Sequence, residues 1–107
     1  MNPDPAILAE LVRITVEAVQ PQRVILFGSA ARGTMGADSD LDVLVVMPDG
    51  CDSLAVTQTL HGRLSRLGVA KDIVVVQASD VEQYGQNPYL VIHSALSGGR
   101  ELYHATS

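Results

Sequence analysis

Three aspartates stand at the beginning of two apolar segments in this sequence. Asp40 and Asp42 flank the first residue of LDVLVVM (41–47), and Asp72 opens DIVVV (72–76). Side chains two residues apart on a strand lie on the same face, about 6.5 Å apart along the backbone. Two carboxylates placed in this way repel each other unless a cation lies between them. Mg²⁺ prefers one or two carboxylates together with phosphate oxygens and water, so the spacing predicts a magnesium site.

The third carboxylate strengthens this interpretation if the two apolar segments are neighbouring strands. Asp72 would then converge with the other two acids, and a pair of metal ions about 4 Å apart could clamp an in-line phosphoryl or nucleotidyl displacement. The alternative is turn chemistry, because an aspartate at the start of a strand often only hydrogen-bonds its own backbone. We assign that role to Asp38. Asp40, Asp42 and Asp72 taken together favour metal binding.

A small loop before the first pair of acids has the composition of an anion site. Gly28-Ser29 follows the apolar run RVILF (23–27) and precedes a possible helix start, where backbone N–H groups and the helix dipole favour phosphate. The Ser29 hydroxyl can donate a further hydrogen bond, and Arg32 lies about one helical turn on. The loop matches neither the P-loop pattern nor the Rossmann pattern, so alone it is weak evidence.

The elements that must position these residues follow from hydrophobic spacing and from cap and turn residues. Asp4-Pro5 has the types of a helix N-cap and first helical residue, and apolar residues keep helical spacing to about Gln20. Residues 23–27 and 41–47 are strands, with room for one or two helical turns over 29–34. The rest of the chain predicts, in order, a helix over 52–67 ended by Gly68, a strand over 72–76, a short helix with a capping box from Ser79 to Glu82, a helix from Asn87-Pro88 to about Leu96, and a last strand, RELYH (100–104).

Strands that alternate with helices predict an α/β fold with a largely parallel or mixed sheet. The strands contain LVV and IVVV without polar alternation. Such strands are covered on both faces.

Composition narrows the function classes. The chain has 107 residues, 47% of them apolar, so we expect one domain over 1–107 with a core that needs no disulfide. Cys51 is the single cysteine, which fits a reducing cytoplasm. No apolar run approaches the roughly 20 residues of a membrane span. The formal net charge of −5 argues against a domain that grips nucleic acid by its phosphates.

Three segments together resemble the minimal nucleotidyltransferase (MNT) family of the polymerase-β-like superfamily: GSAARG (28–33), SDLDVLV (39–45) and KDIVVV (71–76). The resemblance implies the polymerase-β-like fold, a small mixed sheet flanked by helices. It also implies transfer of a nucleoside monophosphate from a nucleoside triphosphate, with loss of pyrophosphate and with Mg²⁺ held by three acids.

Carried over by position, the resemblance gives the loop a nucleotide-binding role. Gly28 and Ser29 would hold the triphosphate, Arg32 matches the family's arginine in the same loop, and Ser39 is counted with them. Ala30 departs from the pattern, because many relatives carry a basic residue there.

The same transfer makes Asp40, Asp42 and Asp72 both the metal ligands and the catalytic residues, with Asp72 helping to deprotonate the acceptor hydroxyl. Small free-standing members resemble the antitoxin of a pair whose other half is a HEPN-domain ribonuclease toxin. The resemblance therefore implies ATP as substrate, AMP transfer to a tyrosine of that toxin, and a hetero-oligomer of the two proteins.

Two other functions stay open at this point. The chain could neutralise a HEPN toxin by binding alone, without catalysis. It could also transfer nucleotides to a small molecule or an RNA, although the acidic balance and the absence of room for an acceptor-binding domain count against this.

Overall fold

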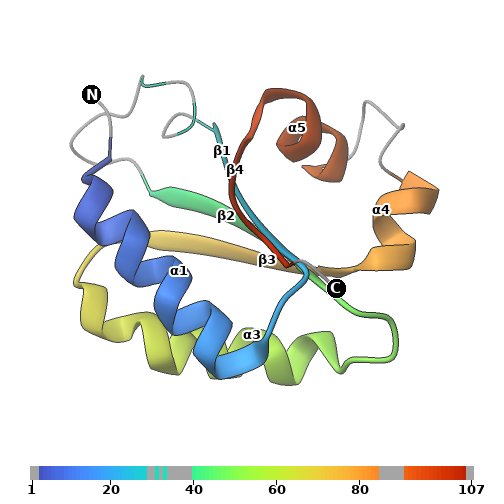
Figure 1. The fold of residues 1–107 in the computed structure, drawn as a ribbon, viewed down its shortest axis with the longest axis horizontal. Coiled ribbons are helices and arrows are strands. Elements are labelled where there is room, and N and C mark those ends of the chain that lie inside the picture. The colour runs from blue at the N-terminus through green and yellow to red at the C-terminus, as the bar shows by residue number, and fades with distance from the viewer. Residues whose placement is uncertain (1–2, 29–30, 32, 34–39, 85–90, 106–107) are drawn as a thin grey trace.

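The computed structural model describes residues 3–28, 31, 33, 40–84 and 91–105. A four-stranded sheet lies between two layers of helices (Figure 1). The elements are, in chain order, α1 (Pro5–Val19), β1 (Arg23–Phe27), β2 (Leu41–Met47), α3 (Ser53–Leu64), the 3₁₀ turn η1 (Ser65–Leu67), β3 (Lys71–Gln77), α4 (Ala78–Tyr84), α5 (Val91–Gly98) and β4 (Arg100–His104). Most of the predicted turns at 29–34 and the Asn87-Pro88 pair lie outside the described residues.

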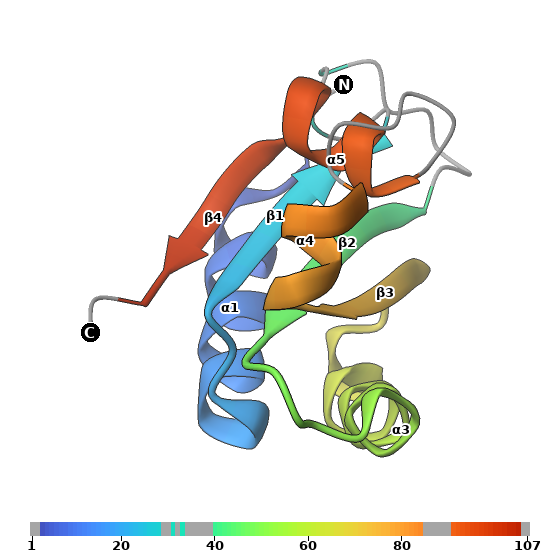
Figure 2. The ribbon, with the colours of Figure 1, turned by 90° about the vertical axis from the view of Figure 1, so that its right-hand side faces the viewer.

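The sheet is mixed, as the α/β prediction allowed. Its strand order is β3-β2-β1-β4, which Figure 2 shows from the side of α4 and α5. β2 and β3 are parallel, whereas β1 is antiparallel to both β2 and β4. The predicted strands 23–27, 41–47 and 100–104 are confirmed, and the strand predicted over 72–76 is one residue longer at each end.

Both faces of the sheet are covered, which confirms the prediction from its unbroken apolar runs. On one face, Leu8 and Leu11 of α1 and Leu60 and Leu64 of α3 pack on the odd-numbered positions of β2. On the other face, α5 packs Ile92 and Ala95 on Leu44 and Val46. The side chains of β2 from Val43 to Met47 are all buried, so this strand is held between two apolar layers.

Caps and turns end the helices on the α1 and α3 side much as the sequence predicts. Asp4 Oδ1 accepts a hydrogen bond from the Ala6 N–H at 2.9 Å, and Gln20 ends α1 with φ of 52°. The helix predicted over 52–67 is divided, however, because its last turn is the 3₁₀ turn η1. Ser65 Oγ donates to the Gly62 carbonyl oxygen at 2.8 Å, and this kind of side-chain bond competes with regular helix. Gly68, with φ of 66°, ends the segment.

The predicted capping box of α4 is wrong in its residues. The helix begins at Ala78, so Ser79 lies inside it. Asp80 Oδ2 accepts from the Gln77 N–H at 2.9 Å, and Asp49 Oδ1 accepts from the Ser79 N–H at 2.8 Å. Asp49 belongs to the turn after β2, so one of the two caps comes from a distant segment, whereas the sequence predicts a purely local pair.

The side chain of Gln77, the last residue of β3, also forms hydrogen bonds with the turn after β2. Its Oε1 accepts from the Gly50 N–H at 3.0 Å, and its Nε2 donates to the Cys51 carbonyl oxygen at 3.3 Å. We call this group (Asp49, Gly50, Gln77, Ser79 and Asp80) the turn latch. It ties the C-terminal ends of β2 and β3 together. Among the described helices, none is long and apolar enough to cross a membrane.

The N-cap of α3 provides a test of the helix that supports β2 and β3. Asp52 Oδ1 accepts from the N–H groups of Leu54 and Ala55 at 3.1 and 3.2 Å. Asp52→Ala should cost about 1 kcal/mol of folding free energy and lower Tm by about 5 °C, because two orphan donors lose their partner. The measurement is thermal unfolding by circular dichroism. Gln58→Ala on the exposed side of the same helix is the control, and equal Tm values for the two variants would contradict the cap.

Candidate functional site

The structure brings Asp42 and Asp72 together. β3 lies beside β2 in parallel, and Asp42 and Asp72 are register partners. Register partners project from the same face of a sheet, here the face covered by α4 and α5. The condition set by the sequence, that the two acidic strands be neighbours, is therefore met. Asp42 is half-buried and Asp72 is exposed, so a ligand can approach the pair from solvent.

A backbone hydrogen bond fixes this register at the acidic end. The Leu41 N–H donates to the Ala70 carbonyl oxygen at 3.0 Å, immediately before the two aspartates. Leu41 itself is 2% exposed and packs in the core on the α1 and α3 side. Because successive side chains alternate between faces, anchoring Leu41 in the core directs Asp42 to the opposite face.

Asp40 lies just before β2 and is exposed. It lies two residues before Asp42, and positions two apart on an extended chain face the same side. It stands at the start of the strand, as the sequence predicts. The three acids thus share one end of the sheet, with one carboxylate half-buried between strands and two in solvent.

Gly28 lies against Asp42. The end of β1 is antiparallel to the start of β2, and Phe27 is the register partner of Asp42. Gly28 has φ of 71°, and a β-carbon placed on it would overlap Asp42 Oδ2 and would lie 3.2 Å from Cγ. Only glycine satisfies both conditions. The predicted phosphate-loop glycine therefore also makes room for the carboxylate.

The residues fit a divalent cation in chemical type, and the strand pairing places them at one end of the sheet. Their oxygens are the hard ligands that Mg²⁺ prefers, and the missing β-carbon of Gly28 keeps space beside Asp42. Within the described part of the chain, no three His, Cys, Asp or Glu side chains are close enough together to hold a metal. Carboxylates repel one another without a cation, so separated side chains are what electrostatics favours for the chain alone. The ligand assignment stays a prediction.

Three of the predicted nucleotide-binding residues, Ser29, Arg32 and Ser39, lie outside the described residues. Their assignment also stays a prediction. Gly33, from the same loop, is half-buried and forms an interaction with at least one other residue.

Sequence reasoning missed Phe27 as a neighbour of the site. It is half-buried and packs against the core on the α4 and α5 side, next to Asp42 in the sheet. The sequence shows Phe27 only as the last residue of a strand. Its pairing with Asp42 depends on how the intervening loop folds back, and no local pattern gives that register.

A family model supplies the identity of the fold. The nucleotidyltransferase domain matches residues 8–92, which include the three strands β1, β2 and β3 and every predicted site residue. The chain belongs to the nucleotidyltransferase domain family. This confirms that the three segments belong to a nucleotidyltransferase domain, as their resemblance predicts.

Solved structures agree with this nucleotidyltransferase fold. A toxin–antitoxin complex crystallised with AMP-PNP matches with a TM-score of 0.65 and 20% identity, covering 92% of this chain and 74% of that chain. The complex of tri-AMPylated Shewanella oneidensis HEPN toxin with MNT antitoxin matches with a TM-score of 0.56 and 17% identity, covering 94% and 71%. A putative nucleotidyltransferase from Sulfolobus solfataricus has a TM-score of 0.59 and 17% identity, covering 92% and 78%.

At these identities the likeness concerns the fold. MNT antitoxins are thus among the structural neighbours of this chain. No curated protein sequence matches it.

Gly28 gives a direct test of the geometry. Gly28→Ala should lower the free energy of unfolding by about 1–3 kcal/mol, because alanine is strained at a φ of 71° and its methyl group meets Asp42. Gly62→Ala is the matched control. Gly62 lies inside α3 with open space around it, so alanine should stabilise the helix by about 0.5–1 kcal/mol. Urea unfolding measures both, and a Gly28 variant as stable as the parent would contradict the close contact.

Substitution of the acids gives a second test, which separates their effect on ligand binding from their effect on folding stability. Asp40→Asn and Asp72→Asn should leave Tm without metal unchanged or raise it by up to about 5 °C, since each removes like-charge repulsion from an exposed position. Both should abolish the thermal stabilisation produced by ATP with Mg²⁺. Glu82→Gln, an exposed neutralisation on α4, should retain it. A clear loss of metal-free stability in the aspartate variants would mean that these residues are structural caps.

Proposed function

We propose that this chain is a Mg²⁺-dependent nucleotidyltransferase that moves AMP from ATP to a tyrosine hydroxyl of a HEPN ribonuclease toxin, and so acts as an antitoxin in a hetero-oligomer with it. The observation that carries the proposal is the register pairing of Asp42 with Asp72 beside Gly28. This pairing places two carboxylates at the same end of the sheet, and carboxylate oxygens are the ligands that Mg²⁺ prefers.

The comparisons support the choice of nucleotide and partner. One neighbour is a toxin–antitoxin complex with AMP-PNP, and another contains a HEPN toxin that carries AMP groups beside an MNT antitoxin. A third is a mutant MntA–HepT complex in which two aspartates two residues apart are replaced by glutamate. That spacing is the spacing of Asp40 and Asp42 in this chain.

Different residues of this chain would bind the triphosphate and accept the proton of the acceptor hydroxyl. The backbone at Gly28, with the Ser29 hydroxyl and Arg32, would hold the triphosphate and turn its α-phosphorus toward the aspartates. Asp72, the most exposed of the register pair, would accept the proton of the acceptor hydroxyl at a carboxylate oxygen. The acceptor oxygen then bonds to the α-phosphorus, the bond from that phosphorus to the bridging oxygen breaks, and pyrophosphate leaves.

Asp40, Asp42 and Asp72 would hold Mg²⁺, which when bound offsets the negative charge of the triphosphate and of the departing pyrophosphate. Asp42 is suited to be the fixed member of this set. It is half-buried between Phe27 and Asp72 and confined by Gly28, whereas the other two acids are in solvent. The apolar residues that follow it in β2 are buried, so the strand gives it a rigid base.

Intact mass of the partner protein tests this function. The HEPN protein should be co-purified with this chain and incubated with ATP and Mg²⁺. We expect its mass to rise by one or more AMP units, and we expect no rise with Asp40→Asn or with EDTA. Glu82→Gln should behave as the parent does, since that residue is exposed on α4 away from the acids.

The same experiment separates the competing functions. A stable complex without any mass gain from ATP, GTP, CTP or UTP would contradict protein nucleotidylation and leave an antitoxin that acts by binding alone. Pyrophosphate release that continues without the HEPN protein, when a small molecule or RNA is added, would contradict the choice of acceptor.

A further inference from the structure

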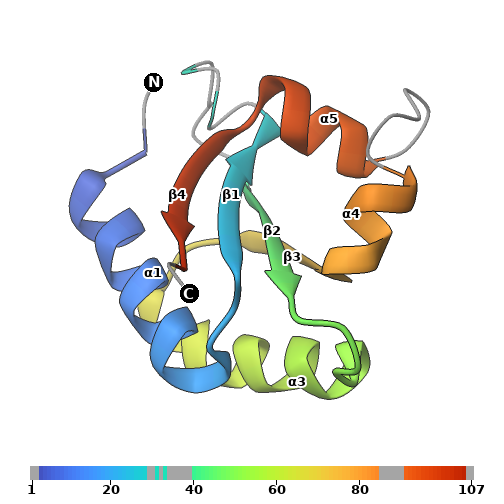
Figure 3. The same cartoon turned by 45° about the vertical axis from the view of Figure 1, so that its right-hand side comes forward.

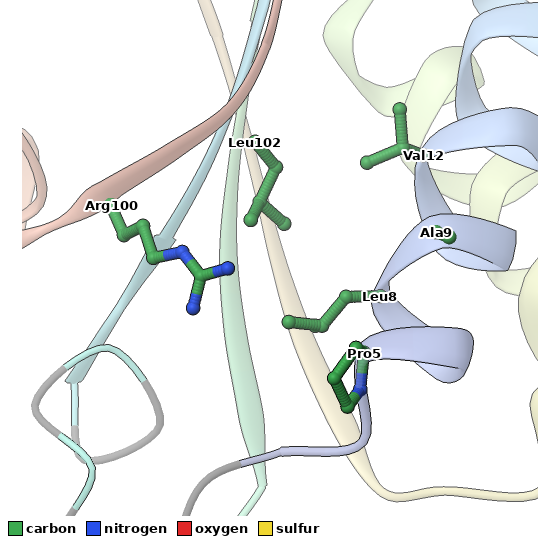
Figure 4. Close-up of a pocket in the computed structure, with 6 residues that line it drawn as sticks. All are labelled: Pro5, Leu8, Ala9, Val12, Arg100 and Leu102. Carbon is green, nitrogen blue, oxygen red and sulfur yellow. The ribbon is translucent and has the colours of Figure 1, made fainter.

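An open groove of about 350 Å³ lies between α1 and β4, on the side of the sheet away from Asp42. Its lining is apolar except for one arginine: Pro5, Leu8, Ala9, Val12, Arg100 and Leu102. Figure 4 shows Leu8 and Leu102 pointing toward each other across the groove, with Arg100 reaching along the same side from β4. Figure 3 shows α1 running beside β4, the edge strand of the sheet.

The α1 side of the groove has the pattern of a helix-packing surface. Pro5, Leu8, Ala9 and Val12 follow the spacing i, i+3, i+4 and i+7, which forms one stripe along a helix. Ala9 and Pro5 are exposed, and a small residue in the middle of a stripe lets another helix approach closely. Leu8 and Val12 also pack in the core on this side of the sheet, so Pro5 and Ala9 are the members of the stripe that are open to a partner.

Arg100 gives the groove a charge preference. Its neighbour Glu101 is bound on the opposite face of β4, where Arg23 Nε donates to Glu101 Oε2 at 2.7 Å and holds the pKa of Glu101 below its ordinary value. Arg100 is exposed, and among the described residues no carboxylate forms an ion pair with it. A cation beside an apolar surface, in a chain with a formal charge of −5, favours a ligand that brings its own carboxylate.

The irregular pairing of β4 disfavours a strand of another protein as the occupant of the groove. The register between β1 and β4 shifts between Val24 and Ile25, because Leu102 is the extra residue of a bulge. Bulges in edge strands discourage pairing with a further strand. A second copy of this chain is disfavoured as well, because each copy has a charge of −5.

We propose that the groove between α1 and β4 is a docking site for an amphipathic helix of another protein, in which a large apolar side chain fits beside Ala9 and Leu102 and a carboxylate one helical turn away pairs with Arg100. Residues four apart on a helix are neighbours on one face, so the partner sequence has a leucine-like residue and an acid at that spacing. The proposal does not depend on nucleotide transfer.

The test uses two synthetic peptides of about 18 residues, alanine-based so that they form helix. They have the same composition, but one places glutamate and leucine four residues apart and the other places them two apart, on different faces. Titration into the ¹⁵N-labelled chain should give saturable shifts at residues 5–12 and 100–103 with the first peptide. The second should bind at least fivefold more weakly.

Variants assign the binding to the groove. Arg100→Gln and Ala9→Gln, both at exposed positions, should weaken binding of the first peptide at least tenfold. The matched controls, Arg66→Gln in η1 and Ala55→Gln in α3, are also exposed and should change it less than twofold. Equal binding of the two peptides, binding that survives Arg100→Gln, or no shifts at 1 mM peptide would overturn the proposal. So would a dimer of the chain itself that dissociates in Arg100→Gln, since a second copy would then occupy the groove.

Discussion

The register pairing of Asp42 with Asp72 is the constraint on which the candidate site depends. The two residues are register partners on parallel strands, and like charges in that position oppose the pairing. The pairing holds because the strands behind them are buried apolar runs covered by helices on both faces. The burial of Val43 to Met47 far outweighs the repulsion of one charged pair at the solvent end.

Gly28 depends on the same arrangement, although it comes from a third strand. The antiparallel pairing of β1 with β2 returns the end of β1 to the start of β2, where Phe27 and Gly28 meet Asp42. A glycine suited to phosphate by its position and an aspartate suited to metal are then in contact. Because of this contact, a side chain at residue 28 would displace the carboxylate even if no phosphate ever bound.

Most of the strands could be predicted from the sequence, because they depend on local patterns. RVILF and LDVLVVM have the length of strands and clear boundaries in the sequence. Asp40 and Asp42 are two residues apart, and the two-residue period of a strand is enough to predict that they share a face. The cap of α4 was wrong because Asp49 reaches it from a distant turn. Phe27 as a neighbour of Asp42 and the groove beside Arg100 were not predicted, since both arise from pairing partners and helix placement that no single segment contains.

The turn latch gives the opposite end of the sheet a role in the site. A slip of β3 by one residue would turn Asp72 to the other face and separate it from Asp42. Gln77 bonds the Gly50 N–H and the Cys51 carbonyl oxygen, and Asp49 bonds the Ser79 N–H, so the C-terminal ends of β2 and β3 are fixed relative to each other. With Leu41 bonded to Ala70 at the acidic end, the strand pair is anchored at both ends. The register that places Asp42 beside Asp72 is therefore held by hydrogen bonds at both ends of the strand pair.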